Sequence, residues 1–348
     1  MLEESDLFVS GTNGYHTYRI PALVVTTEGT VLAFCEARRN SRHDDGEIDL
    51  MLRRSTDGGR TWSDGQVIAD DGDHTMGNPC PVVNQGDGTV WLPFCRDNRR
   101  VFVINSKDDG RTWSAPAEIT NNVMAPGWPW IGTGPGHGIQ LQNGRLVIPS
   151  WTGKGPHVSR QTIERSVVIY SDDDGLNWRQ SAPFGEDESN ECEAVELVDG
   201  SLYMNMRSLP ERHQRSFSLS RDGGQSWSKV GYDAALPEPS CQASIVRFTA
   251  TTYSDKNRVL VAGPANPDAR ACLTVRISYD ECRTWPASKI LYPGAAAYSD
   301  LTVADDGQLL CLYEADEYAR LVLARFDIEW LTDGTDSLQQ PKMAASRI

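Results

Sequence analysis

Short runs of apolar and β-branched residues alternate with turns rich in Asp and Gly along the 348 residues of the chain. Runs such as residues 49–54 and 217–220 have the length and residue types of β-strands. No ten-residue stretch shows a helical period, so strands and turns should dominate. The pattern predicts an all-β protein.

Five turns share one motif, of the general form S-x-D-x-G-x-T-W. They are residues 55–62, 106–113, 171–178, 220–227 and 278–285. Each follows a strand-like run and should connect two strands of a hairpin. The Asp carboxylate can accept N–H groups of a tight turn, Gly supplies positive φ, and Trp anchors the hairpin by burial. Five copies with one spacing identify a repeat protein.

The spacing of the closing tryptophans predicts the architecture. They are 51, 65, 49 and 58 residues apart, so about six units of this size fit the chain. We therefore expect a six-bladed β-propeller that forms a single domain over residues 1–348. The sixth unit should come from the strands around residues 304–308, with the N-terminal strand closing the ring.

Composition limits the partners of the protein. Lys and Arg number 33 against 48 Asp and Glu, giving a net charge of −15, which argues against nucleic acid and anionic membranes. The chain has no apolar run of membrane-spanning length, and its first six residues are too polar for a signal peptide. We expect a protein that stays in the cell or that has lost a signal peptide.

The eight cysteines and six histidines show no spacing typical of metal ligands. We expect no cofactor and no catalytic metal, and activity that survives EDTA. The cysteines are interpreted as small buried side chains, with disulfides as the alternative. Cys282 replaces the Gly of the fifth turn, so that hairpin could adopt a different turn, or Cys272 and Cys282 could face each other across neighbouring strands.

Three arginines stand in or beside runs that otherwise read as inner strands: Arg19, Arg207 and Arg270. An arginine that points toward a core needs a partner for its charge. Each could simply pair with a carboxylate at the edge of a sheet.

The chain resembles the sialidase (exo-α-neuraminidase) family from about residue 15 to residue 334. The resemblance lies in Tyr-Arg-Ile-Pro at residues 18–21, the five Asp-box turns, and Tyr-Ser-Asp-Leu at residues 298–301. It includes the segments 34–39, 134–138 and 326–331. The resemblance implies a six-bladed propeller with its site near the central axis.

The resemblance implies that Arg19, Arg207 and Arg270 bind the carboxylate of a sialic acid. Guanidinium groups suit this task because they form paired, charge-assisted hydrogen bonds with a carboxylate. Glu314 matches the glutamate that holds the first arginine. Arg276 competes with Arg270 for the third place, and we prefer Arg270 because it precedes a Leu-Thr-Val strand by three residues.

The catalytic residues also follow from the resemblance. Sialidases use a Tyr nucleophile where most glycosidases use Asp or Glu, and a neutral phenol avoids repulsion by the substrate carboxylate. Tyr298 matches the nucleophile and Glu191 matches its base. Asp44 matches the acid/base that protonates the leaving oxygen, with its neighbour Asp45 as the competing candidate.

Two further positions are expected to support the site. Arg38 matches an additional arginine of the family, and Met76 lies where the family lines a pocket for the N-acyl group of the substrate. We expect a retaining exo-α-sialidase that acts on sialylated oligosaccharides, glycoproteins or glycolipids such as gangliosides. The alternatives are a catalytically silent propeller that binds sialoglycans and a trans-sialidase-type transferase.

Overall fold

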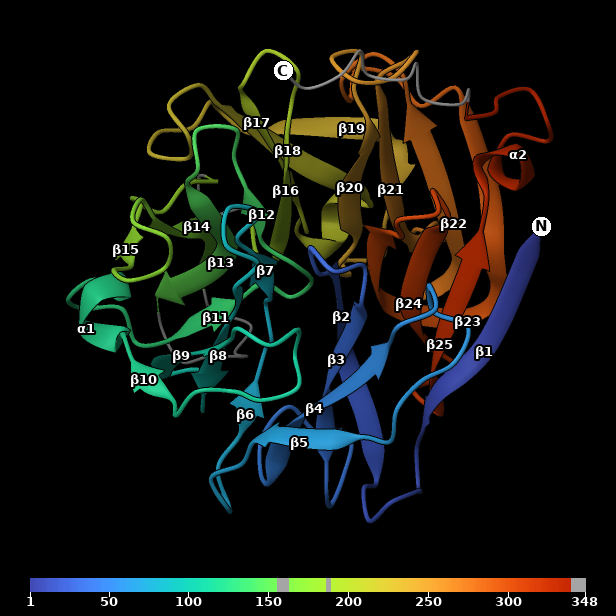
Figure 1. Cartoon of the computed structure of the whole chain (residues 1–348). Helices are drawn as coiled ribbons and strands as arrows, with labels where there is room; N and C mark the ends of the chain where they lie inside the picture. The colour runs from blue at the N-terminus through green and yellow to red at the C-terminus, as the bar shows by residue number, and fades with distance from the viewer. Residues whose placement is uncertain (155–162, 186–188, 339–348) are drawn as a thin grey trace, which may run out of the picture.

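The computed structural model describes residues 1–154, 163–185 and 189–338. Nearly all regular structure in these residues is antiparallel β-sheet, as predicted. The sheets follow one another around a common centre, so the colour of the chain changes from blue through green and yellow to red around the ring (Figure 1). The fold is that of a β-propeller, which confirms the predicted fold class.

The first three units of the ring are formed by consecutive strands. The first contains β2 (Thr17–Val25), β3 (Val31–Arg38), β4 (Ile48–Ser55) and β5 (Gln66–Ala69). The second contains β6 (Met76–Gly77), β7 (Val82–Val83), β8 (Val90–Arg96), β9 (Arg100–Ser106) and β10 (Ala117–Glu118). The third contains β11 (Ile131–Thr133), β12 (Ile139–Gln140), β13 (Leu146–Lys154), β14 (Ile163–Ser171) and β15 (Arg179–Gln180).

The remaining strands complete the ring. The fourth unit contains β16 (Cys192–Glu196), β17 (Leu202–Met206), β18 (Gln214–Ser220) and β19 (Gly231–Pro237). One larger sheet joins β20 (Ser244–Thr249), β21 (Arg258–Pro264), β22 (Ala271–Ser278), β23 (Ala287–Val303), β24 (Leu309–Ala315), β25 (Arg320–Phe326) and β1 (Leu2–Val9). Short helices occur at α1 (Thr120–Val123), α2 (Ile328–Leu331) and a 3₁₀ turn (Pro210–Arg212).

The long strand β23 belongs to two successive units. Its first half pairs with β22, from Ala287 to Ala295, and its second half pairs with β24, from Ala296 to Val303. Divided at this point, the seven-stranded sheet gives two units of four strands each, with β23 in both. The pairing among the described residues then corresponds to six units.

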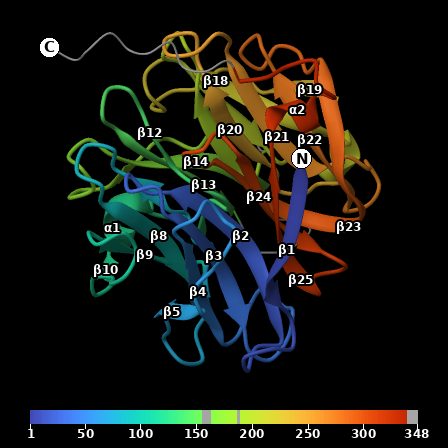
Figure 2. The ribbon, with the colours of Figure 1, turned by 45° about the vertical axis from the view of Figure 1, so that its right-hand side comes forward.

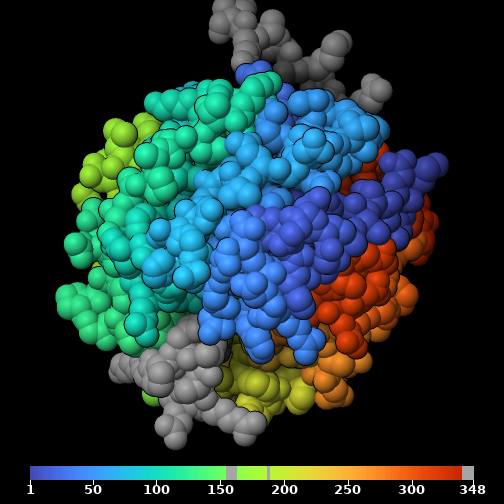
Figure 3. Space-filling view, turned by 90° about the horizontal axis from the view of Figure 1, so that it is seen from below, coloured from blue at the N-terminus to red at the C-terminus, as the bar shows by residue number. Residues whose placement is uncertain are grey.

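The N-terminal strand closes the ring. Strand β1 pairs with β25 from Leu2 to Val9, so the last unit takes its outermost strand from the start of the chain. Figure 2 shows β1 lying along β25, and Figure 3 shows the dark-blue N-terminal segment against red C-terminal residues at the surface. The predicted ring closure is therefore confirmed.

Each of the five Asp-box turns lies between the last two strands of its unit. In the first turn, the Asp57 carboxylate accepts hydrogen bonds from the backbone and hydroxyl of Thr61, and Ser55 Oγ accepts one from Gly59 N. The fifth turn has the same bonds around Asp280, and Cys282 N donates to Ser278 Oγ with φ at +64°. The expectation of a different fifth turn is therefore wrong, because these bonds hold Cys282 in the conformation of the glycine.

The sixth unit has no Asp-box turn among the described residues. The turn at residues 304–308 connects β23 with β24, the first two strands of this unit. At the position where the other units have their Asp-box, the chain continues after β25 into α2, and the fourth strand is supplied by β1.

The hydrophobic core is divided into clusters between neighbouring units. All eight cysteines are unpaired, and seven of them are buried, in agreement with their interpretation as small buried side chains. Cys272 is partly exposed and does not pair with Cys282. No helix in the described part of the chain is long and apolar enough to span a bilayer.

Candidate active site

A polar cavity of about 360 Å³ opens near the centre of the ring. Side chains from several units line it, and they include most of the residues singled out in the sequence. The lining residues are Arg19, Ile20, Glu36, Arg38, Asp44, Thr75, Asn78, Asn98, Trp151, Glu164, Asn190, Glu191, Arg207, Arg270 and Tyr298. The structure thus brings together the three arginines, Tyr298, and the carboxylates of Asp44 and Glu191.

Arg19 enters the cavity at a break in strand β2. The pairing register of β2 with β3 shifts between Arg19 and Ala22, and Ile20 between them has φ of +57°. A bulge of this kind changes the direction of a side chain relative to the regular pleat. The Glu314 carboxylate on β24 accepts hydrogen bonds from Arg19 Nε at 3.0 Å and Nη2 at 3.3 Å, and from Ile20 N. Glu314 therefore fixes both the arginine and the bulge.

Arg207 follows directly after β17. Its Nη1 lies 2.8 Å from Glu191 Oε2, and its Nε donates to Ser240 Oγ at 3.2 Å. Arg270 precedes β22, and it donates hydrogen bonds to two neutral groups: Tyr318 Oη at 3.3 Å and the Ser240 carbonyl at 3.4 Å. Within the part of the chain that the structure describes, no carboxylate lies within ion-pair distance of Arg270.

Arg276, the competing candidate, lies in the middle of β22 opposite Val261 and Ser288 and does not line the cavity. Burial lowers its pKa, and the charge of Asp233 opposes this effect. The structure therefore places Arg270, and not Arg276, among the cavity residues.

Tyr298 and Glu191 form a hydrogen bond at the floor of the cavity, from the Tyr298 hydroxyl to Glu191 Oε1. Arg207 Nη1 also donates to Tyr298 Oη at 3.2 Å. The guanidinium carbons of Arg19 and Arg270 lie 5.3 and 5.4 Å from the centre of the Tyr298 ring. Burial and the charge of Glu191 raise the pKa of Tyr298, whereas Arg207 and Arg270 oppose this rise. The phenol is therefore neutral at rest and touches a base.

Asp44 lies on the loop between β3 and β4, with its side chain 62% exposed. Its Oδ1 accepts hydrogen bonds from Arg38 Nη1 at 2.8 Å and Arg19 Nη1 at 3.0 Å. Partial desolvation raises the pKa of Asp44, but the charges of Arg38 and Arg19 outweigh it, so the pKa is below its usual value. Asp45 is exposed and does not line the cavity.

Arg38 holds the Asp44 loop in place. Its Nη1 donates to the carbonyl oxygens of Arg42 and His43, and its Nε and Nη2 donate to Glu36 Oε2. Glu36 also accepts a hydrogen bond from Asn78 N at 2.9 Å. The Glu36–Arg38 pair thus connects the wall of the cavity to the loop that carries Asp44.

Met76 does not line the cavity. It is 4% exposed and belongs to the core cluster with Phe34 and Leu92, while its neighbours Thr75 and Asn78 line the cavity. The structure therefore does not support Met76 as a pocket residue. Its apolar side chain packs between the first two units.

Several cavity residues were not predicted. Glu36 could have been found, because it stands two residues before Arg38 and shares its face of β3. Trp151 and Glu164 lie in β13 and β14, and no unusual residue pattern indicated that these strands reach the centre of the ring. Burial raises the pKa of Glu164, and the charge of Arg207 opposes this effect.

The fold and the cavity define a class of protein: a β-propeller with Asp-box repeats whose central cavity is lined by arginines and carboxylates. A family model described as a BNR repeat-like domain matches residues 29–311. A sialidase of Micromonospora viridifaciens is 33% identical over 94% of this chain and 54% of the relative, so the chain spans about half of that protein. Sialidase-3 of Bos taurus is 31% identical, with 86% of each chain covered.

Among solved structures, the Hadza microbial sialidase Hz136 matches with a TM-score of 0.86 and 28% identity, covering 94% of this chain and 69% of that one. These similarities extend over most of the chain. The chain belongs to the sialidase family of glycoside hydrolases.

Proposed function

We propose that this protein is a retaining exo-α-sialidase that removes terminal sialic acids from sialylated glycans. The observation that carries this proposal is the Tyr298–Glu191 hydrogen bond beside three arginines in one cavity. Neither part alone would suffice, since arginine clusters bind many anions. A phenol paired with a carboxylate base next to a carboxylate-binding cluster fits a substrate whose reacting carbon bears a carboxylate.

The three arginines bind the substrate carboxylate. Arg19 and Arg207 are each held by a protein carboxylate, Glu314 and Glu191 respectively. Arg270 has neutral partners among the described residues and keeps its charge available for a ligand. A carboxylate bound by planar guanidinium groups is oriented as well as attracted. This orientation sets the anomeric carbon above Tyr298.

The first chemical step forms a glycosyl-enzyme. Tyr298 Oη attacks the anomeric carbon while Glu191 accepts the phenolic proton. The glycosidic bond breaks, and its oxygen leaves with a proton from Asp44. In the second step Asp44 accepts a proton from water, the water oxygen attacks the anomeric carbon, and the Tyr298 oxygen leaves and regains its proton from Glu191. Two inversions give net retention of configuration.

Asp44 shares Arg19 with the incoming substrate. Asp44 is held by Arg19 and Arg38 and has a low pKa, which suits a base better than an acid. A substrate carboxylate that occupies Arg19 Nη1 removes one of these partners and adds a negative charge nearby. Both changes raise the pKa of Asp44 and prepare it to donate a proton.

The test is NMR observation of 3- and 6-linked sialyllactose during hydrolysis. We expect the α-anomer of free sialic acid as the first product, followed by slow conversion to the β-anomer. Appearance of the β-anomer first would overturn the retaining mechanism. Binding without turnover would identify a sialoglycan-binding protein, and transfer to a second sugar in place of water would identify a transferase.

A further inference from the structure

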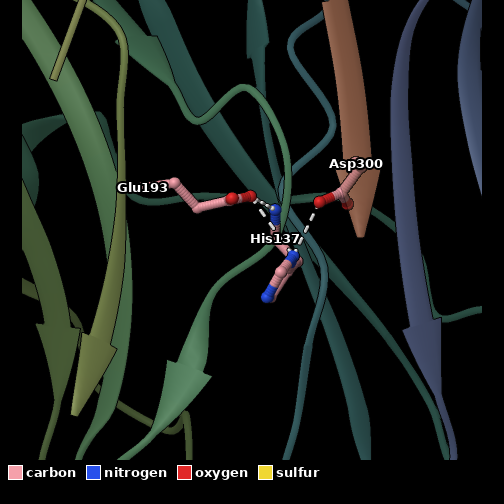
Figure 4. Close-up of side chains that lie close together, drawn as sticks. All are labelled: His137, Glu193 and Asp300. Atoms are coloured by element: carbon pink, nitrogen blue, oxygen red, sulfur yellow. Dashed lines mark hydrogen bonds and ion pairs between the residues drawn. The ribbon is translucent and has the colours of Figure 1, made fainter. Parts of the chain in front are cut away.

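A second charged cluster lies buried beneath the proposed catalytic pair. His137 Nδ1 is 2.8 Å from Asp300 Oδ1 and 3.2 Å from Glu193 Oε1, and the backbone N–H of His137 also donates to Glu193 at 2.9 Å. Figure 4 shows the two carboxylates approaching this nitrogen from opposite sides. Glu193 and Asp300 have no exposed surface. None of the three residues lines the cavity.

The cluster is close to the catalytic pair along both chain segments. Glu193 on β16 is two residues after Glu191, which immediately precedes this strand, and Asp300 on β23 is two residues after Tyr298. The register of β23 with β24 shifts between Ala296 and Ser299, so the regular alternation of side chains begins only after Tyr298. The start of β16 and the second half of β23 are thus joined twice: by the Tyr298–Glu191 hydrogen bond and, two residues further along each segment, by the ion pairs through His137.

The cluster is also fixed to the rest of the ring. Asp300 accepts hydrogen bonds from Leu23 N on β2 at 2.6 Å and from Ser244 Oγ on β20 at 3.0 Å. Glu193 Oε2 accepts one from Ile245 N on the same strand, β20. Innermost strands of four units thus meet at these two carboxylates, and His137 adds the loop of a fifth.

The backbone around His137 is adapted to this close approach. Gly136 has φ of +94°, and a Cβ atom there would lie 2.1 Å from Glu193 Oε1. Only glycine allows the loop to come near enough for the His137 backbone and ring to reach Glu193.

A proton on His137 completes the cluster. Two buried carboxylates raise the pKa of His137, which outweighs the opposing effect of its burial. Desolvation raises the pKa of Asp300 to about 7, in spite of its bond to His137. The three side chains have the spacing of possible metal ligands. However, the facing carboxylate oxygens already accept hydrogen bonds from His137, Ser244 and Leu301, and the Nδ1 proton lies where an ion would have to bind.

We propose that His137 is a positioning residue that sets the distance between the Tyr298 hydroxyl and the Glu191 carboxylate by holding Glu193 and Asp300 together. This inference rests on the proposed function of the pair above it. Arg207 contacts the pair itself, but Arg19 is held by Glu314, and Arg270 contacts Tyr318 and Ser240. A shift of β16 against β23 should therefore affect the chemical step more than binding. A displacement of about 1 Å between reacting groups can cost as much as 100-fold in rate.

The test compares two substitutions that place an amide nitrogen differently. Asparagine puts it near the position of Nδ1, and glutamine puts it near the position of Nε2. Calorimetric titration with the inhibitor 2-deoxy-2,3-dehydro-N-acetylneuraminic acid counts the competent sites, which are the folded sites that bind it. For an aryl sialoside, kcat is then calculated per competent site, and KM is measured alongside. We expect His137→Gln to lower kcat about tenfold or more, with KM and inhibitor Kd within about threefold of wild type. His137→Asn should retain most of kcat.

Two further variants keep the test decisive. If His137→Gln does not fold, Glu193→Gln is measured in the same way, with the same loss of kcat expected. Asp336→Asn is the control, because it breaks a buried ion pair with Arg258 away from the cavity. It should lower the melting temperature without changing kcat per site.

Three results would contradict the proposed role of His137, and they can be told apart. A kcat per competent site within about twofold of wild type would show that His137 is purely structural and overturn the inference. An equal rise in KM and inhibitor Kd would do the same, because the arginines would then depend on the cluster too. A wild-type protein that binds the inhibitor but hydrolyses no sialoside would refute the proposed function and this inference with it.

Discussion

At the scale of single residues, the three cavity arginines differ in the groups of the protein that balance their charge. Arg19 is bound by the fully buried Glu314 carboxylate, and Arg207 is bound by Glu191. Arg270 contacts a hydroxyl and a carbonyl oxygen, and it is flanked by the Tyr298 ring. A ligand carboxylate should therefore gain most of its binding free energy at Arg270, which has no carboxylate partner among the described residues.

This difference leads to a prediction for Arg270. Arg270→Lys should lower kcat/KM about tenfold or more, because an ammonium group cannot form the paired hydrogen bonds of a guanidinium. Arg276→Lys is the matched control, since it changes the same residue type on the adjoining strand β22 without touching the cavity. Steady-state kinetics on sialyllactose measures both. A large loss in the control with normal Arg270→Lys would mean that Arg276 is the third arginine.

A second prediction separates the neighbours Asp44 and Asp45. A sugar alkoxide needs protonation to leave, whereas an activated phenol does not. Asp44→Asn should therefore nearly abolish hydrolysis of sialyllactose and retain more activity on an aryl sialoside. Its pH profile for sialyllactose should lose the alkaline limb, which reports deprotonation of the acid in the complex.

Asp45→Asn is the control for this test, because Asp45 is exposed and outside the cavity. It should change the rate with either substrate less than about threefold. Strong discrimination between the two substrates in this variant would transfer the acid role to Asp45. Equal, modest losses in both variants would show that neither carboxylate is the acid.

At the scale of elements, the Asp-box turns are held by charge-assisted hydrogen bonds. Hydrogen bonds from Thr61 lower the pKa of Asp57 to about 2, and Asp108 and Asp222 have similar values. In the unfolded chain these groups have their ordinary pKa near 3.8. A folded pKa below the unfolded one stabilises the native state above about pH 4, and this stabilisation is lost as the pH falls toward 2.

The corresponding prediction concerns Asp57→Asn. At pH 7 the variant should melt about 1–3 °C below wild type, because an amide accepts hydrogen bonds more weakly than a carboxylate. At pH 2 the difference should become much smaller, since the wild-type carboxylate is then about half protonated in the folded protein and almost fully protonated in the unfolded chain. Thermal unfolding followed by circular dichroism at both pH values measures this. A difference that is equal at both pH values would show that the charge of Asp57 does not stabilise the turn.

The sequence predicted the hairpins better than the way in which strands connect one unit to the next. The Asp-box motif located five hairpins, because a Ser and an Asp two residues apart satisfy the turn wherever it occurs. Strand β23 was hidden, because Pro293-Gly294 in its middle is a turn signal, yet the strand runs on and joins two units. The turn at residues 304–308 was assigned to the sixth unit correctly, but its composition did not reveal which two strands it connects.

The candidate site was predictable where charge is unusual. An arginine in a strand such as Tyr18-Arg19-Ile20 stands out, whereas Trp151 looks like any core residue of a strand. The burial of Met76 in the core was not visible for a related reason: β6 has only two residues, too few for a period that would show which face is buried. The His137 cluster escaped notice because its members are far apart in sequence and meet only at the centre of the ring.

At the scale of the whole molecule, the ring depends on a strand contributed by the other end of the chain. β1 pairs with β25 from Leu2 to Val9, with a register shift at Leu7, and side chains reinforce the pairing. Glu4 accepts a hydrogen bond from Tyr313 at 2.7 Å, and Asp6 forms an ion pair with Arg320 at 2.6 Å. The proposed active site uses residues of the same last unit, including Tyr298 and Glu314. Closure of the ring and integrity of the site should therefore be coupled.

The last prediction tests this coupling with a variant that begins at residue 10. Without β1, strand β25 becomes an open edge with unpaired backbone groups, and Leu7 and Phe8 leave the core cluster that they share with Leu321. The melting temperature should fall by about 5 °C or more, and kcat/KM should fall with it. A synthetic peptide of residues 1–12 should restore both in a saturable manner, whereas a scrambled peptide of the same composition should not. Wild-type stability and activity in the truncated protein would show that the last unit holds the site without closure by β1.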